Sequence, residues 1–149
     1  VDEHTEYHLQ QSRKPRHAVM KVKNHTQVAQ NEVTMEGATG CQVRSLVSDA
    51  DGAPTFAMRE FEVQPGGHTP KHFHPYEHEI FVLEGHGEVL DGDQPRPLGA
   101  GDVVYVAPND VHQFRNTGDR PLRFLCLIPN SATGQQVTVV SECSVAENE

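Results

Sequence analysis

The stretch from Gly66 to Gly85 constrains the fold and the function more than any other part of the chain. It reads GGHTPKHFHPYEHEIFVLEG and places three histidines, His72, His74 and His78, ahead of an apolar run. His72 and His74 are two residues apart, so an extended backbone would project both imidazoles from one face, and His78 has the same parity. Neutral imidazole is the commonest metal ligand near neutral pH. The stretch therefore predicts a metal site built on histidines.

A second stretch, residues 101–116, offers a further ligand. It reads GDVVYVAPNDVHQFRN, in which His112 alternates with Phe114 after an Asn-Asp turn. The alternation indicates a strand that presents both side chains on one face. We therefore expect His112 to be the fourth ligand, contributed from a distant segment of the chain.

The two stretches together resemble the paired motifs of the cupin superfamily, which are small β-barrels with a metal on inward-facing histidines. The first family motif is a glycine, five residues, His-x-His, three or four residues, a glutamate, six residues and a glycine. Gly66, His72, His74 and Gly85 fit this pattern. Counting back from Gly85 places His78 where the family usually has glutamate.

Glu79 offers a competing frame for the same motif. It follows His74 after four residues, but only five residues separate it from Gly85, whereas His78 satisfies both spacings. The frame with His78 also resembles a subgroup of small single-domain manganese cupins with a four-histidine site. That resemblance implies the ligand set His72, His74, His78 and His112.

The second family motif fits with one departure. Gly101, His112 and Asn116 match its spacing, but Pro108 lies one place late. Asn109 stands where the family usually has glycine, and asparagine tolerates a positive φ better than most residues. We interpret the departure as a changed turn next to an intact site.

Composition excludes several classes of function. The net charge of −9 argues against a nucleic-acid partner, because such proteins normally carry a basic patch. No apolar run approaches membrane-spanning length, so no membrane partner is expected, and the N-terminus lacks the apolar core of a signal peptide. The 3 cysteines are widely spaced and imply no disulfide framework. A reducing compartment and a cytoplasmic location are therefore expected.

The spacing of short apolar runs and turns predicts an all-β chain without a convincing amphipathic helix. The resemblance implies that it forms a cupin jelly-roll β-barrel. We expect a polar N-terminal extension at residues 1–19, the barrel domain at residues 20–130 and a C-terminal tail at residues 131–149. The predicted strands cover residues 41–48, 56–64, 103–106, 122–128 and 137–140.

One cation falls on a face that should point inward. The predicted strand at residues 56–64 alternates apolar side chains with Arg59 on one face, opposite Glu60 and Glu62. An unpaired buried charge is costly, so Arg59 needs a partner. The partner is either an acidic residue in an internal salt bridge or an anionic substrate.

The expected substrate pocket draws on three strands. Ile80 and Val82 share the parity of His78, Phe114 shares that of His112, and Phe124 alternates with Cys126 on a strand that lines the cavity in similar manganese cupins. A buried cysteine is usually inert packing, so Cys126 is expected to form pocket wall and not to act as a nucleophile. The expected pocket residues are Ile80, Val82, Phe114, Phe124 and Cys126.

The resemblance implies one divalent transition metal per chain, manganese first and iron next, although imidazole also suits zinc, nickel and copper. We expect a metal-dependent, dioxygenase-like oxidoreductase that acts on a small organic molecule. Arg59 would orient the substrate, and Glu79 would fix the tautomer of a histidine. The alternatives are a Lewis-acid isomerase or lyase, with Glu79 or His68 as base, and a non-catalytic small-ligand-binding domain. By resemblance, the protein is expected to be a homodimer.

Overall fold

The computed structural model describes residues 20–132 and 137–140. The predicted extension at residues 1–19 lies outside this part of the chain, as does most of the predicted tail. The described part consists of β-strands joined by turns and three short 3-10 helices. None of these helices has the length and apolar character that a membrane crossing requires. The prediction of an all-β chain is confirmed.

The strands largely follow the predicted ranges. In chain order they are β1 (Gln30–Glu32), β2 (Thr39–Val47), β3 (Phe56–His68), β4 (His72–Phe73), β5 (His78–Glu84), β6 (His86–Asp91), β7 (Gln94–Gly99), β8 (Val103–Val106), β9 (His112–Arg115), β10 (Leu122–Pro129) and β11 (Thr138–Val139). The helices are η1 (His25–Gln27), η2 (Asp49–Asp51) and η3 (Asn130–Ala132). The short strand β1 had no counterpart among the predictions.

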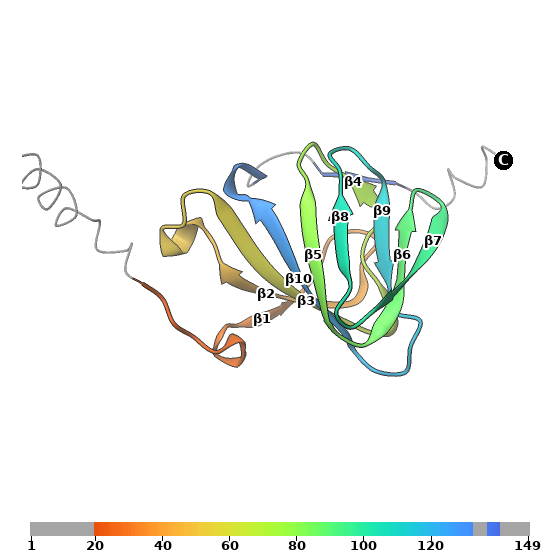
Figure 1. The fold of residues 1–149 in the computed structure, drawn as a ribbon, viewed down its shortest axis with the longest axis horizontal. Helices are drawn as coiled ribbons and strands as arrows, with labels where there is room; N and C mark the ends of the chain where they lie inside the picture. Colours follow the sequence, from red (N-terminus) through yellow and green to blue (C-terminus); the bar gives the residue numbers. More distant parts are fainter. Residues whose placement is uncertain (1–19, 133–136, 141–149) are drawn as a thin grey trace, which may run out of the picture.

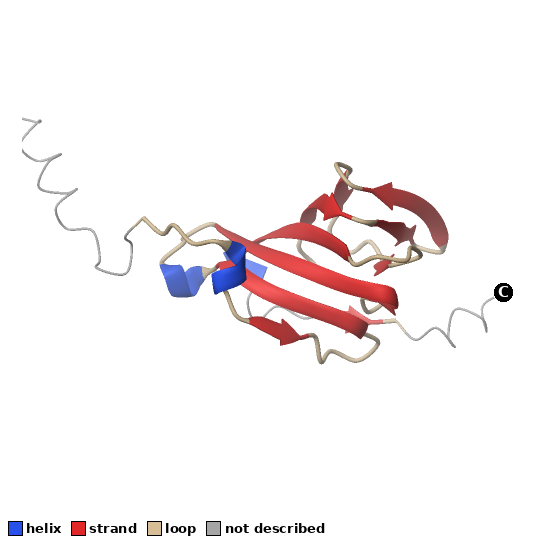
Figure 2. Ribbon diagram, turned by 90° about the horizontal axis from the view of Figure 1, so that it is seen from below, coloured by secondary structure: helices blue, strands red, loops and turns tan. Residues whose placement is uncertain are grey.

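All strands pair in an antiparallel manner and form one curled sheet. Its main path runs β11-β4-β9-β3-β10-β5-β8, while β1 joins through β2 to β3 and β7 joins through β6 to β9. Figure 1 shows β6 and β7 at one end of the molecule and β1 and β2 at the other. The curl, visible from below in Figure 2, brings the strands around a common interior. The fold is a jelly-roll β-barrel, as predicted.

Alternation along the strands builds the core. In β5 the side chains of His78, Ile80 and Val82 are buried, while those between them face outward. Each fully buried aliphatic or aromatic side chain contributes roughly 1.5–3 kcal/mol of transfer free energy. The core cluster consists of Cys41, Val63, Ile80, Val82, Val89, Leu98, Val106, Phe114, Leu122, Phe124 and Cys126.

Two turn residues hold the ligand-bearing strands in place. Gly85 ends β5 with φ 83°, and a Cβ atom there would collide with the carbonyl oxygen of Pro121, so no side chain fits. Asn109 has φ 67° in the turn before β9. The prediction that asparagine replaces the family glycine in a left-handed turn is confirmed.

The outer face of β3 is covered, which the sequence pattern did not predict. Glu60 points away from the barrel interior, yet it is only 4% exposed. Its carboxylate accepts from Arg123 Nη1 at 2.7 Å and lies 2.8 Å from His25 Nδ1. The segment around η1 therefore packs over this face and satisfies the buried charge.

Candidate metal centre

Four histidines meet inside the barrel because three strands begin at that end. β4 begins with His72, β5 with His78 and β9 with His112, while His74 follows β4 in the next turn. The pairing of β4 with β9 places His72 directly opposite His112. The His-x-His spacing thus acts together with a distant strand start, as the two motifs predicted.

Three of these histidines form a group suited to a metal ion. One ring nitrogen from each of His72, His74 and His112 lies within 4.8 Å of the others. The ring centroids of His72 and His112 are 4.4 Å apart, and those of His74 and His112 are 5.1 Å apart. The group is largely buried, so water competes weakly for any ion held there.

The hydrogen bonds of these three rings define which nitrogen is free. In each case Nδ1 donates to a backbone carbonyl oxygen two residues away, at 2.7 Å from His72 to Pro70, 2.7 Å from His74 to Tyr76 and 2.8 Å from His112 to Asp110. A carbonyl oxygen can only accept, so the proton is on Nδ1 and the lone pair is on Nε2. In the described part of the chain, Nε2 of His74 and of His112 is buried and has no hydrogen-bond partner. Buried nitrogen lone pairs without a partner are what a metal ion would satisfy.

Burial also keeps the imidazoles neutral. Loss of hydration lowers the pKa of His74 to about 4 and of His112 to about 4, and it lowers the pKa of His72 as well. The pKa of His78 is shifted furthest down, first by burial and then by the positive charge of Arg59. Neutral imidazole is the form that binds a metal, so the cluster is ready at physiological pH.

His78 lies beside the group of three without belonging to it. Its ring stacks on that of His74 with centroids 4.3 Å apart, and its centroid is 5.2 Å from that of His112. Its Nε2 is buried and has no partner among the described residues. Within residues 20–132 and 137–140, its Nδ1 contacts no carbonyl oxygen and instead lies 3.2 Å from Cys126 Sγ.

Glu79 lies on the opposite face of β5 from His78. Its side chain is exposed, and its strand partners are Tyr105 and Leu127. Burial and the neighbouring Glu77 raise the pKa of its carboxyl group. The structure therefore does not bring Glu79 to the histidines, because successive strand residues point to opposite faces. His68 also lies apart from the cluster, where its ring contacts Gln113.

An apolar cavity of about 300 Å³ lies next to the cluster. His72, His78 and His112 form part of its wall. Of the predicted pocket residues, Phe114, Phe124 and Cys126 line it, whereas Ile80 and Val82 lie in the hydrophobic core and not in the wall. Their parity was predicted correctly, since both are buried, but the wall is formed by the residues paired with them on β10, Cys126 and Phe124.

Arg59 is the cationic side chain of this cavity. Its Nη2 donates to Cys126 Sγ at 3.2 Å, and its guanidinium carbon lies 4.9 Å from the centroid of the Phe61 ring. Its Nε is buried without a partner. No carboxylate in the described ranges pairs with Arg59, so the internal salt bridge, one of the two alternatives, is not what the structure shows. The guanidinium is left facing the cavity.

Several residues of the cavity wall were not predicted from the sequence. Tyr76 stacks on His74 with centroids 3.9 Å apart and lines the cavity. Its aromatic character was visible in the histidine stretch, where it follows Pro75. The segment near β1 and β2 supplies Val33, Met35 and Val43. Val33 and Met35 lie outside the predicted strands, and Val43 lies within the predicted strand at residues 41–48 but was not assigned to the site.

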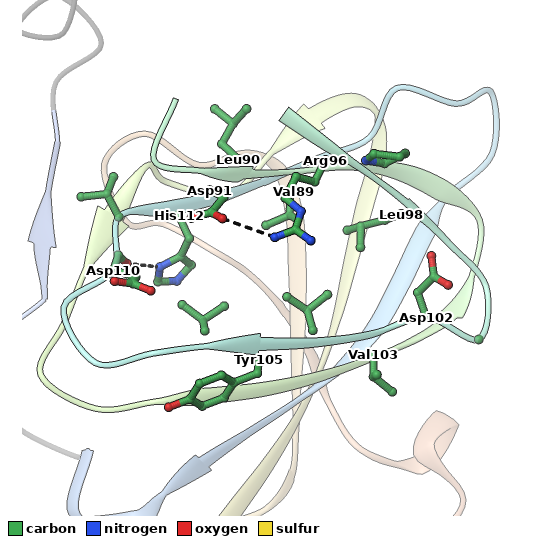
Figure 3. A pocket seen from close by; sticks show the side chains of 15 residues that line it. Val89, Leu90, Asp91, Arg96, Leu98, Asp102, Val103, Tyr105, Asp110 and His112 are labelled. Carbon is green, nitrogen blue, oxygen red and sulfur yellow. Dashed lines mark hydrogen bonds and ion pairs between the residues drawn. The ribbon is translucent and has the colours of Figure 1, made fainter. Parts of the chain in front are cut away.

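A second cavity of about 530 Å³ lies on the other side of His112. Figure 3 shows it between the β6–β7 hairpin and β8, with Arg96 directed toward Asp91 across its upper wall. These two side chains are 3.4 Å apart and largely exposed. His112 lines both cavities.

The fold is a jelly-roll barrel, and histidines from both sequence motifs lie together at one end of it. These two features are typical of a class of small metal-binding β-barrel proteins. Residues 59–128 match the family described as the Cupin domain. The chain belongs to the cupin family.

Known relatives are similar over different shares of their length. The structure of the polyketide cyclase RemF from Streptomyces resistomycificus superimposes with a TM-score of 0.75 at 34% identity, covering 83% of this chain and 89% of RemF. Protein SchB of Streptomyces halstedii is 38% identical over 101 residues, which are 66% of this chain and 72% of SchB. The 1-methylthio-D-xylulose 5-phosphate methylsulfurylase of Rhodospirillum rubrum is 35% identical over 74 residues, or 50% of this chain, and the chain spans only 47% of that protein.

Proposed function

We propose that the protein is a metal-dependent enzyme that acts on a small β-dicarbonyl compound, whose methylene C–H groups are acidic. His72, His74 and His112 would hold one divalent ion, with His78 as fourth ligand. Manganese and iron remain the expected ions, with zinc, nickel and copper also suited to imidazole. The observation that carries the proposal is the set of buried, partner-free Nε2 atoms beside an apolar cavity.

An ion held by these histidines would supply Lewis-acid polarisation of a substrate carbonyl group. The protein itself would contribute a positive charge and an apolar cavity that excludes water. The guanidinium of Arg59 faces the cavity and would stabilise negative charge that develops on a substrate oxygen. Phe61, Phe114 and Phe124 line the wall and keep water from the reacting groups.

The cavity wall restricts the kind of substrate. Among the described residues that line it there is no carboxylate, and burial raises the pKa of both the Cys126 thiol and the Tyr76 hydroxyl. The site therefore offers no strong general base at neutral pH. A substrate whose methylene groups lie between two carbonyls needs no strong base, because such C–H groups ionise readily once a carbonyl is polarised. Poly-β-carbonyl chains are compounds of this class.

The similarity to RemF supports the same substrate class. That protein is described as a polyketide cyclase, and the match covers most of both chains at 34% identity. Intramolecular condensation of a poly-β-carbonyl chain is thus the reaction we favour: a methylene carbon bonds to a carbonyl carbon of the same chain, and the two methylene protons leave with that carbonyl oxygen as water. Of the three expectations from sequence, this lies closest to the Lewis-acid alternative.

Dioxygenase-like oxidation is the second candidate. The same neutral imidazoles would hold a redox-active ion, and the adjacent cavity would admit a small organic substrate. The two candidates differ in a measurable way. Condensation proceeds with redox-silent zinc and without oxygen, whereas a dioxygenase consumes oxygen and requires a metal that changes its oxidation state.

The deciding experiment uses metal-free protein reloaded with Zn²⁺, Mn²⁺ or Fe²⁺ and a synthetic poly-β-ketone as substrate. Formation of a cyclised product with Zn²⁺ under anaerobic conditions supports the proposal. Oxygen uptake with Mn²⁺ or Fe²⁺ and no anaerobic product supports the second candidate. His112→Ala should abolish turnover, while the exposed His86→Gln serves as the matched histidine control. Failure of the protein to bind any of these ions contradicts both candidates.

The homodimer, the cytoplasmic location and the domain boundaries at residues 20–130 stay predictions. The family match at residues 59–128 lies inside those boundaries.

A further inference from the structure

We infer that Cys126 is a positioning residue whose sulfur accepts N–H groups from both His78 and Arg59. One sulfur atom would therefore orient both the His78 ring, the proposed fourth ligand, and the guanidinium of Arg59. The inference rests on the proposed function, because it assigns a purpose to that metal centre and that cation. Cys126 would then be more than the pocket wall expected from sequence.

The strand register brings the three residues together. Cys126 lies on β10, directly opposite Arg59 on β3 and opposite Ile80 on β5. His78 is two residues from Ile80 and so points to the same face, diagonal to Cys126. β10 is the middle of these three strands, so the side chain of Cys126 lies between Arg59 on one side and His78 on the other.

The contacts agree with this arrangement. Cys126 Sγ lies 3.2 Å from Arg59 Nη2 and 3.2 Å from His78 Nδ1, and the residue is 1% exposed. A guanidinium can only donate hydrogen bonds, so the sulfur acts as acceptor toward Arg59. Acceptance of the His78 Nδ1–H by the same sulfur leaves the lone pair of His78 on Nε2, which is the buried, partner-free atom.

Sulfur performs here the task that backbone carbonyls perform for the other three histidines. Each of those rings is oriented by an oxygen two residues away, whereas His78 has no such carbonyl partner and uses Cys126, 48 positions along the chain. Groups that hold the far nitrogen of a ligating histidine typically contribute 10–100-fold to metal affinity. Loss of the sulfur should therefore weaken metal binding through His78.

A sulfur atom also suits Arg59 better than a carboxylate would. A carboxylate at position 126 would form a buried ion pair with the guanidinium and neutralise it. The neutral thiol orients the guanidinium through one weak hydrogen bond and leaves its positive charge available to the cavity. Arg59 has no acidic partner in the described part of the chain, and Cys126 is neutral. The positive charge of the guanidinium therefore remains available to a ligand in the cavity.

Cobalt titration of the metal-free protein tests the link to His78. Cys126→Ala should weaken Co²⁺ binding by about 10–100-fold and alter the Co²⁺ absorption spectrum in the same way as His78→Ala. In the His78→Ala background, Cys126→Ala should cause no further loss. Cys126→Ser keeps an acceptor and should retain most of the affinity. Cys41→Ala is the matched control, because Cys41 is equally buried but contacts the carbonyl oxygens of Thr39 and His68.

Binding of benzoate to the metal-free protein tests the link to Arg59. Arg59→Gln should abolish benzoate binding, and Cys126→Ala should weaken it while Cys41→Ala leaves it unchanged. The inference is overturned if Cys126→Ala binds Co²⁺ and benzoate like the wild type, or if its effect persists in full in the His78→Ala background. Wild-type protein that binds no Co²⁺ overturns the proposed function itself, so the two failures are distinguishable.

Discussion

At the scale of single residues, parity along β5 decides the identity of the fourth candidate ligand. His78 is 6% exposed and faces the cluster, while Glu79 lies on the outer surface of the strand. The two frames differ by one position, and one position in a strand reverses the direction of the side chain. A cluster of neutral imidazoles without a carboxylate is the result.

The lowered pKa values predict the pH range over which a metal is retained. Protons compete with the metal for Nε2 only when the imidazole becomes protonated, and the pKa of His74 and of His112 is lowered to about 4. A lowered pKa keeps the neutral, binding form present at more acidic pH. Bound Co²⁺ should therefore persist below pH 6.5, the ordinary histidine pKa, and be lost as the pH falls toward 4. Absorbance of the Co²⁺ protein during acid titration measures this, and loss centred near 6.5 would contradict it.

Two glycines with positive φ offer a paired test of local strain. Gly66 has φ 79° with open space around a built Cβ, while Gly85 has φ 83° and a Cβ that would collide with Pro121. Gly66→Ala should lower the free energy of unfolding by about 1 kcal/mol. Gly85→Ala should cost about 1–3 kcal/mol more, because overpacking adds to the strain. Urea denaturation of both variants gives the difference, and equal costs would disprove the steric argument.

At the scale of elements, the outer face of β3 shows how the first described segment is attached to the barrel. Glu60 bonds Arg123 and lies beside His25, and Arg123 also bonds Glu84. A charged group of this kind is expensive to bury and is retained only when it is paired. The network joins the η1 segment to β3, β10 and β5.

Removing the carboxylate of Glu60 should therefore destabilise the protein. Glu60→Gln is expected to lower the free energy of unfolding by about 2 kcal/mol, the range for hydrogen bonds to charged groups. Glu62→Gln is the matched control, since Glu62 accepts an exposed bond from Gln30 and should change stability by less than about 0.5 kcal/mol. Thermal unfolding of the two variants compares them. Equal melting temperatures would show that the network contributes nothing.

The sequence was enough to predict part of the fold and part of the candidate site, but not all of either. His72, His74 and His112 were predictable because motif spacing and strand parity are local properties. The partner of Arg59 was not, because it depends on the register between β3 and β10, and Cys126 is 67 positions away. Glu60 was placed correctly on the face opposite Arg59, but its burial could not be predicted, since the segment that covers it has no periodic pattern. Ile80 and Val82 had the predicted parity, but their depth in the barrel could not be inferred from alternation alone.

At the scale of the whole molecule, apolar side chains gather on the outside of β5 and β8. Phe81 pairs with Val103 across these strands, and both are exposed, as are Leu83 and Tyr105. In the described sheet β8 has no strand on its other side. An exposed apolar strand at a sheet edge favours association with another chain. This surface is where the predicted homodimer would form.

Light scattering coupled to size exclusion tests that prediction. The wild type should elute as a dimer, and Val103→Lys should shift it toward monomer because a charge would be buried in the interface. Glu32→Lys, on the exposed strand β1, which pairs with β2 and not with β5 or β8, is the control for added charge and should leave the mass unchanged. A monomeric wild type, or a Val103→Lys protein that stays dimeric, would contradict this placement.

The hydrogen bonds of the histidine rings also divide the site by distance along the chain. His72, His74 and His112 are each oriented by an atom two positions away, so each ring keeps its direction as long as its own turn survives. His78 depends on an atom 48 positions away, on β10, so its direction depends on the pairing of β5 with β10. On gradual heating, three imidazoles should keep their alignment while the fourth loses it. Coordination by His78 would thus report whether β5 and β10 are still paired.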